Sequence, residues 1–141
     1  MIGGRKQYKD VSVPINNALN RDKGTFAEHS GELIWFKNQV NHEADWDIKR
    51  KDPWERTIGS TFPGDYNTTV VLYGTFTTPE ELGNITYGYL GSAAGFGEKT
   101  LIAGSIYAAG VWSVITDKAA RTNEFNDHDA IRKGIDWYYG R

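Results

Sequence analysis

Cysteine is absent from this 141-residue sequence, so disulfide bonds, cysteine-ligated zinc and a cysteine nucleophile are excluded by count. Long basic runs are also missing: the longest is Lys49-Arg50-Lys51, and the formal net charge is −2. The chain therefore has no overall attraction to phosphate backbones. The longest apolar stretch, residues 101–115, is interrupted by glycines and serines and is shorter than the roughly 20 residues of a membrane span. We expect a buried helix there and no membrane span.

The sequence does contain enough apolar material for one folded core. Hydrophobic residues make up 39% and aromatics 13%, proportions typical of ordered globular proteins. A length of 141 residues is near the usual size of one domain. We therefore predict a single domain over residues 1–141, in which residues 1–25 form a polar, loosely structured lead-in with one short helix at most.

The first half of the chain has one clear helical pattern. Leu33, Phe36 and Val40 recur at i, i+3 and i+7, which predicts a helix from position 26 to about position 42. Residues 45–66 carry two prolines and two glycines among charged side chains. This composition favours a long irregular segment with turns.

The second half of the chain predicts three more helices. Thr78-Pro79-Glu80-Glu81 combines a capping threonine, a proline at the first helical position and a glutamate three residues after the cap. It predicts a helix from Pro79 to about Ala94, followed by a second over 98–116. The acidic cluster at Asn126 and Asp127 predicts the start of the last helix. The buried stripe of that helix is predicted to contain Ile131, Ile135 and Tyr138.

One short segment has the composition of β structure. Residues 68–76 are rich in β-branched and aromatic side chains, which predicts a short strand or one arm of a hairpin. With the helices above, the expected fold class is mainly α, or α+β: a compact helical domain of about four helices with at most a small β-hairpin.

Glycines share a face of the predicted helix over 79–94. Asn84, Gly88, Gly91 and Gly95 lie at i, i+4, i+7 and i+11. Each mid-helix glycine costs up to about 1 kcal/mol relative to alanine, so something must offset it. Two interpretations are open: close packing against another helix, or room for a substrate beside Asn84.

The markers of metal and nucleotide chemistry are missing. His29, His42 and His128 do not form an HExxH-type pattern, and no G-x-S-x-G or phosphate-binding glycine loop is present. We therefore expect no metal site and no cofactor. Asp45 and Asp47 flank Trp46, and an aromatic neighbour can raise a carboxyl pKa toward a value useful for acid catalysis. Solvated or ion-paired aspartates are the alternative.

Three segments in order resemble the motifs of the bacterial polymorphic toxin type 44 family. The family pattern is approximately W-D-Y-K, then G-N-x-x-Y-G-x-x-G, then D-x-x-x-I-x-x-G-I. This chain has Trp46-Asp47-Ile48-Lys49, then the stretch 83–91, then the stretch 127–135. The family often has histidine where this chain has Thr86, which argues against a mechanism that needs that imidazole.

The resemblance implies a toxin module, the payload of a larger exported carrier protein or secretion machine, delivered into a target bacterial cell. A cognate immunity protein would neutralise it in the producer. Carried over by position, Asp47, Asp127 and Tyr87 are the catalytic candidates, and the substrate-binding candidates are Lys49, Asn84 and Trp46.

Each of these residues also has a structural explanation. Asp127 can cap a helix, Tyr87 can be part of the core, Asn84 can bond a loop, and Lys49 can face solvent.

Three functions remain open from the sequence. The first is a hydrolase that cuts peptidoglycan glycan strands by carboxylate acid/base chemistry, favoured by the carboxylates, the 5 Trp and 8 Tyr suited to stacking on sugars, and the acidic pI near 5.9. The second is a ribonuclease acting in the target cytoplasm. The third is a non-catalytic structural or adaptor domain of a phage tail or secretion apparatus.

Overall fold

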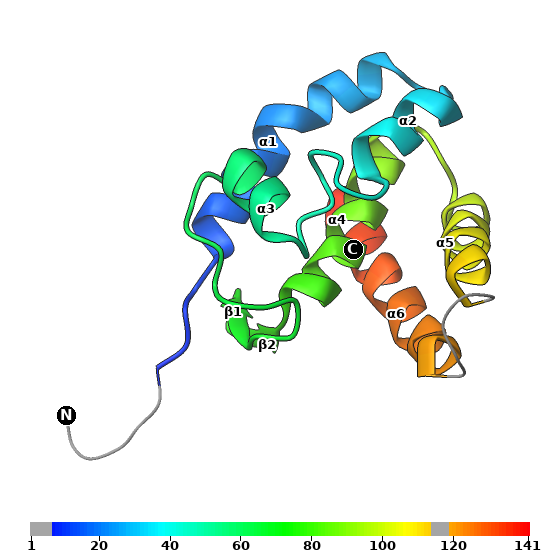
Figure 1. Ribbon diagram of the computed structural model, residues 1–141. Coiled ribbons are helices and arrows are strands. Elements are labelled where there is room, and N and C mark those ends of the chain that lie inside the picture. Colours follow the sequence, from blue (N-terminus) through cyan, green and yellow to red (C-terminus); the bar gives the residue numbers. More distant parts are fainter. Residues whose placement is uncertain (1–6, 114–118) are drawn as a thin grey trace.

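The computed structural model describes residues 7–113 and 119–141, with side chains described outside 106–127. The described part is mainly α with one small antiparallel hairpin, as predicted (Figure 1). It contains six helices where the sequence indicated about four. The elements in chain order are α1 (Ser12–Glu28), α2 (Leu33–Val40), α3 (Lys51–Ile58), β1 (Val70–Leu72), β2 (Thr75–Thr77), α4 (Pro79–Ala93), α5 (Glu98–Ser113) and α6 (Ala119–Tyr139).

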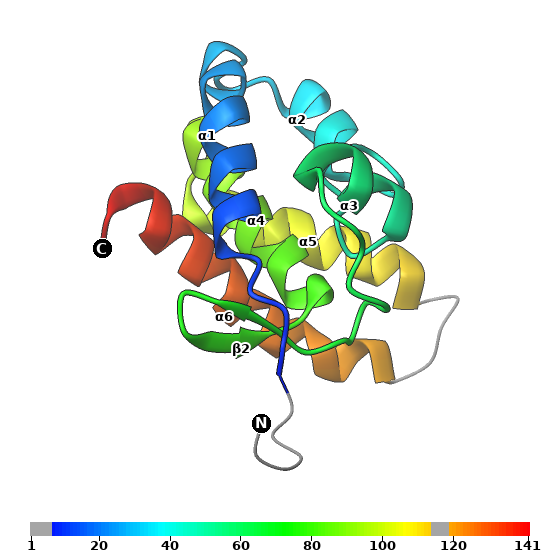
Figure 2. The ribbon, with the colours of Figure 1, turned by 90° about the vertical axis from the view of Figure 1, so that its left-hand side faces the viewer.

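Helix α4 is the centre of the arrangement. It contacts α1, α5 and α6, and Figures 1 and 2 show these helices grouped around it. Its start follows the predicted signal: the Thr78 hydroxyl accepts a hydrogen bond from the Glu81 N–H at 3.1 Å, and Pro79 is the first helical residue. The predicted bounds of this helix are therefore confirmed to within one residue.

Helices α4 and α6 meet through glycine, and we call this contact the glycine seam (Ile85–Tyr89 with Ile131–Ile135). A β-carbon on Gly88 would overlap the carbonyl oxygen of Ile131, and one on Gly134 would overlap the carbonyl oxygen of Ile85. On another side of α4, a β-carbon on Gly91 would overlap the Leu101 side chain of α5. The packing interpretation of the helix glycines is thus confirmed for Gly88 and Gly91.

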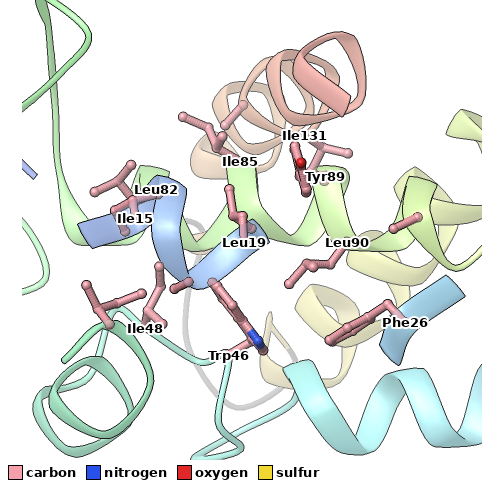
Figure 3. Close-up of a cluster of buried hydrophobic side chains, with 14 of the residues drawn as sticks. Ile15, Leu19, Phe26, Trp46, Ile48, Leu82, Ile85, Tyr89, Leu90 and Ile131 are labelled. Atoms are coloured by element: carbon pink, nitrogen blue, oxygen red, sulfur yellow. The ribbon is translucent and has the colours of Figure 1, made fainter. Parts of the chain in front are cut away.

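The core lies between α1, α4 and the loop that joins α2 to α3. Ile15 and Leu19 of α1 are fully buried, as are Ile48 of the loop and Leu82 of α4. Figure 3 shows these side chains facing one another, with Trp46 beside them. The loop is therefore fixed in place by its apolar residues, and the polar residues between them are held with it.

The N-terminal part is more regular than the sequence predicts. Instead of a loosely structured lead-in, most of the stretch before position 26 belongs to the 17-residue helix α1. Val11, Ile15 and Leu19, four residues apart, are all fully buried, and this spacing places one face of α1 on the core. The helix predicted over 26–42 is in fact the end of α1, a turn at Gly31 (φ 77°) and the short α2.

Helix α3 lies in the segment predicted to be irregular. Pro53 is its third residue, within the first turn, where a backbone N–H has no acceptor inside the helix. Gly59, at φ 77°, ends it in the left-handed conformation. Proline and glycine there mark the ends of a helix, and the prediction of a long loop was wrong for these eight residues.

The predicted strand segment supplies both arms of its own hairpin. Val70 pairs with Thr77 and Leu72 with Thr75, and the two-residue turn is Tyr73-Gly74. Both turn residues have positive φ, 48° and 78°, which is the backbone of a type I′ turn. The strand that pairs with β1 is therefore the continuation of the same segment, β2.

Helix α6 begins earlier than predicted. Its first residue is Ala119, so Asp127 lies inside the helix and does not cap its start. The side chain of Asp127 lies outside the described residues. Ile131 and Ile135 are buried and Tyr138 is half-buried, in agreement with the predicted stripe. The predicted end of α5 near Thr116 also lies outside the described residues.

Among the described helices, none combines the length and the apolar character needed to cross a bilayer.

Candidate functional site

Asp47 is a buried carboxylate in the loop between α2 and α3. Only 7% of the residue is exposed. Its Oδ2 atom accepts hydrogen bonds from the Glu43 N–H at 2.8 Å and from Arg50 Nε at 2.7 Å, and Lys49 Nζ lies 4.0 Å from Oδ1. Glu43 has φ 62°, an uncommon backbone conformation for a residue with a side chain. Asp47 therefore both fixes the loop and presents a carboxylate with a defined orientation.

The other charges near Asp47 are paired as well. Arg56 Nε contacts Asp45 Oδ1 at 2.6 Å, and Lys51 Nζ contacts Glu55 Oε1 at 3.0 Å. Together with Arg50 on Asp47, each of these cations faces a carboxylate. The described loop and α3 therefore form a charge-balanced surface and do not gather a positive patch for phosphate.

Trp46 is a core residue that anchors the loop. It is 3% exposed, and its indole Nε1 donates to Asp22 Oδ2 of α1 at 3.0 Å. The hydrogen bond from Arg21, and then that from Trp46, lower the pKa of Asp22. Figure 3 shows the ring among the buried side chains of α1 and α4. In this position Trp46 anchors the loop that carries Asp47, and its ring is too buried to stack on a substrate.

Tyr87 connects α4 to α5. Its hydroxyl donates to the Leu101 carbonyl at 2.7 Å, and its ring lies 5.5 Å from that of Phe36 in α2. A β-carbon at position 104 would lie 2.8 Å from this hydroxyl, so Gly104 leaves the space that it occupies. Burial raises the pKa of Tyr87 to about 12. At neutral pH the phenol is protonated, as an unperturbed tyrosine also is, and its single proton is used in the hydrogen bond to Leu101.

Asn84 and Thr86 lie on the same helix as Tyr87. Asn84 is half-buried, with its side-chain nitrogen 3.4 Å from the Glu80 carbonyl. Thr86 is fully buried and its hydroxyl donates to the Gly83 carbonyl at 3.2 Å. The position where the toxin family often has histidine is therefore a core position of α4 in this chain.

Five of the six predicted site residues fall into two groups, and the side chain of the sixth, Asp127, lies outside the described residues. Asp47 and Lys49 share the α2–α3 loop, with Trp46 beneath them. Asn84 and Tyr87, three residues apart, share the side of α4 on which Tyr87 meets α5. Phe36 belongs to α2, the helix that precedes the loop, and it links the two groups through its contact with the Tyr87 ring.

A separate hollow of about 250 Å³ opens between the hairpin, α4 and α6. None of the functional-site residues predicted from the sequence lines this hollow. Its wall comes from three separate segments, and no short motif joins them, so only the folded chain reveals it. The lining residues are Leu72, Tyr73, Thr75, Thr77, Glu81, Ile85, Lys133 and Trp137.

Metal ligation has no counterpart in the described residues, where no group of three His, Cys, Asp or Glu side chains could hold an ion.

Comparison with protein families identifies the class. A fold of packed helices, with a fixed carboxylate on a loop and all three motifs in place, fits the toxin resemblance, and the family model for Bacterial toxin 44 matches residues 34–140. The chain belongs to this family of bacterial toxins. The match runs from α2 to the end of α6 and includes all three motifs. Comparison with curated proteins and with solved structures gives no match.

Proposed function

We propose that this toxin domain is a hydrolase that cleaves the glycan strands of peptidoglycan. The observation that carries the proposal is the Asp47 carboxylate, which is 7% exposed and held by two hydrogen bonds. Glycoside hydrolysis needs carboxylates that are fixed in unlike surroundings. A neutral glycan also needs no surplus of cations, in agreement with the charge balance of the loop.

The roles follow from what each group can do at neutral pH. One of Asp47 and Asp127 takes a proton from the attacking water, or acts as nucleophile, and the other gives a proton to the leaving glycosidic oxygen. Water is thereby added across the broken bond. Asn84 donates a hydrogen bond to the substrate, and the Tyr87 hydroxyl, whose own proton is donated to the Leu101 carbonyl, accepts one from it. Lys49, whose Nζ lies 4.0 Å from Asp47 Oδ1, is placed to contact an anionic group of the substrate.

A ribonuclease is the second candidate. Lys49 Nζ lies 4.0 Å from Asp47 Oδ1, and a base beside a cation is the pair that could activate a 2′-hydroxyl and meet the phosphate. The paired state of Arg50, Lys51 and Arg56 counts against it, because a phosphate would have to displace carboxylates from these side chains. We therefore place the glycan first.

The experiment that tests this proposal compares two substrates. Purified wild-type domain, Asp47→Asn, Asp127→Asn and the control Asp45→Asn are incubated with sacculi and, separately, with total RNA. Soluble muropeptides are measured by liquid chromatography and mass spectrometry. We expect them from the wild type and from Asp45→Asn only. Cleaved RNA with intact sacculi would instead establish the ribonuclease. Undiminished toxicity of both other variants, with neither substrate cleaved, would indicate a non-catalytic domain.

Delivery and neutralisation complete the proposal. A larger exported carrier or secretion machine brings the domain to the target cell, and an immunity protein protects the producer. Expression with and without a periplasmic export signal separates the two substrates, because peptidoglycan is reached only in the periplasm. Growth arrest that needs the export signal supports the glycan, and arrest without it supports RNA.

A further inference from the structure

The hollow between the hairpin, α4 and α6 has an aromatic wall. Tyr73 from the turn and Trp137 from α6 meet edge to face, with ring centroids 5.8 Å apart. The ring of Tyr89 in α4 also packs edge to face against Trp137, with ring centroids 5.2 Å apart. Leu72 and Ile85 add apolar surface. An aromatic ring fixed by two others offers a flat, rigid surface at low cost in side-chain entropy.

Polar groups stand around this wall. Thr77, which lines the hollow, is 5% exposed, and its hydroxyl has no hydrogen-bond partner in the part of the chain that the structure describes. Buried hydroxyls are normally bonded, so this one is an unsatisfied polar group in the wall of the hollow. At the rim, Lys133 Nζ contacts Glu81 Oε1 at 3.2 Å, with both side chains partly open to solvent. Such a surface pair is weak enough to rearrange around a ligand.

We infer that this hollow binds one sugar ring of a glycan strand, a step that rests on the proposed function. A pyranose ring has an apolar face of C–H groups and an edge of hydroxyls, which matches an aromatic wall with polar groups around it. The hollow of about 250 Å³ is below the range of about 300–1,000 Å³ for drug-sized ligands, so it suits one ring. Glu81 meets hydroxyl or amide groups of the sugar.

Lys133 narrows the class of sugar further. Its ammonium lies at the rim beside Glu81, where it can meet a carboxylate carried by the ligand. Peptidoglycan supplies such a ligand, because each muramic acid carries a short peptide on its lactyl group and that peptide has free carboxylates. The polymer is long, so a ring held here can anchor a strand whose cleavage takes place at Asp47.

The experiment measures sugar binding directly. Isothermal titration calorimetry uses two probes, an N-acetylglucosamine tetramer and a soluble muropeptide that contains muramic acid. We expect Trp137→Ala to weaken binding of both about tenfold or more and Trp137→Phe to restore most of it. Lys133→Gln should weaken only the muropeptide. Trp35→Ala is the matched control, because Trp35 is a half-buried tryptophan of α2 that does not line the hollow.

The outcomes keep this inference apart from the hydrolase. Asp47→Asn should bind both probes like the wild type while it releases no muropeptides, which supports both proposals. If the wild type binds sugar but does not digest sacculi, the hollow is a sugar-binding site and the hydrolase proposal is wrong. If the wild type digests sacculi without measurable sugar binding, and Trp137→Ala digests them equally well, the sugar-site proposal is wrong and the hydrolase proposal stands. If Trp137→Ala fails to fold, Lys133→Gln at its exposed position decides the same question.

Discussion

Two regions carry the toxin-family motifs, the glycine seam and the α2–α3 loop, and they are held together by different forces. In the seam, Gly88 and Gly134 let the backbones of α4 and α6 touch, and one partly exposed ion pair, Lys133 with Glu81, lies beside this contact. In the loop, Asp47 collects a backbone N–H and a guanidinium, and Arg56 is paired with Asp45. The absence of side chains at the glycines allows the close packing of the first region, and hydrogen-bonded charged groups hold the second region together.

The difference shows where chemistry has to be sought. Three motif glycines, Gly88, Gly91 and Gly134, are accounted for by steric fit, since a β-carbon there would overlap a carbonyl oxygen or the Leu101 side chain. A buried carboxylate is harder to explain by stability alone, because desolvation opposes it and a well-packed apolar residue often stabilises as much. Changes in the seam should therefore alter folding and activity together, and changes in the loop should be able to separate them.

The largest expected effect comes from Gly134→Ala in the seam. The new methyl group would overlap the Ile85 carbonyl oxygen, and two backbones cannot relieve this by a change of rotamer. We expect a loss of at least about 3 kcal/mol in the free energy of unfolding, measured by urea denaturation followed by circular dichroism. Gly83→Ala, on the same α4 but with no heavy atom within 4 Å of the new methyl, is the matched control. Equal stability of Gly134→Ala and wild type would contradict the seam.

Asp47→Asn tests the loop. It removes a charge from a nearly buried group that bonds Arg50 and the Glu43 N–H, so we expect a loss of about 2 kcal/mol in the free energy of unfolding and loss of muropeptide release. Asp45→Asn is the control, because its pair with Arg56 is exposed and contributes about 0–1 kcal/mol. Retained activity in a folded Asp47→Asn variant would reduce Asp47 to a structural role.

The sequence predicts α4 almost to the residue, because Thr78 and Pro79 act locally and need no partner from elsewhere. It underestimates α1, since the polar residues and the glycine inside that helix hide a narrow apolar stripe, and only the core shows that the stripe is used. It misses α3 because Pro53 indicates a break unless its place in the first turn is known. Tertiary packing, which local propensity does not contain, decides both cases.

The candidate site divides in the same way. The sequence points to Asp47 and Tyr87, and the structure gives each defined hydrogen bonds. The sequence gives no sign that Trp137, Thr77 and Lys133 share a hollow. These residues come from the hairpin and from α6, and they meet only when α6 lies against α4.

Tyr87→Phe tests the link between α4 and α5. At pH 7 it removes one hydrogen bond to Leu101, a loss of about 1 kcal/mol. The pKa of Tyr87 is raised to about 12, above its ordinary 10, so the unfolded chain releases this proton first and wild-type stability falls as pH rises from 10 to 12. A shift of one pKa unit corresponds to about 1.4 kcal/mol, so the wild-type advantage should shrink and then reverse in this window. Urea denaturation at several pH values measures it, and parallel curves would contradict it.

The smallest expected change in stability is that of Gly83→Ala. This variant tests whether a motif glycine outside the seam is required for packing. Gly83 lies within α4, and a methyl group there meets no heavy atom within 4 Å. Alanine should therefore raise the free energy of unfolding by about 0.5–1 kcal/mol, because it restricts the unfolded chain and suits the helix better. Stability and muropeptide release are measured on the same preparation. A more stable variant that keeps its activity confines the steric role to the seam. A more stable variant that loses activity would show that substrate approaches α4 beside Asn84, where a side chain at position 83 would obstruct it.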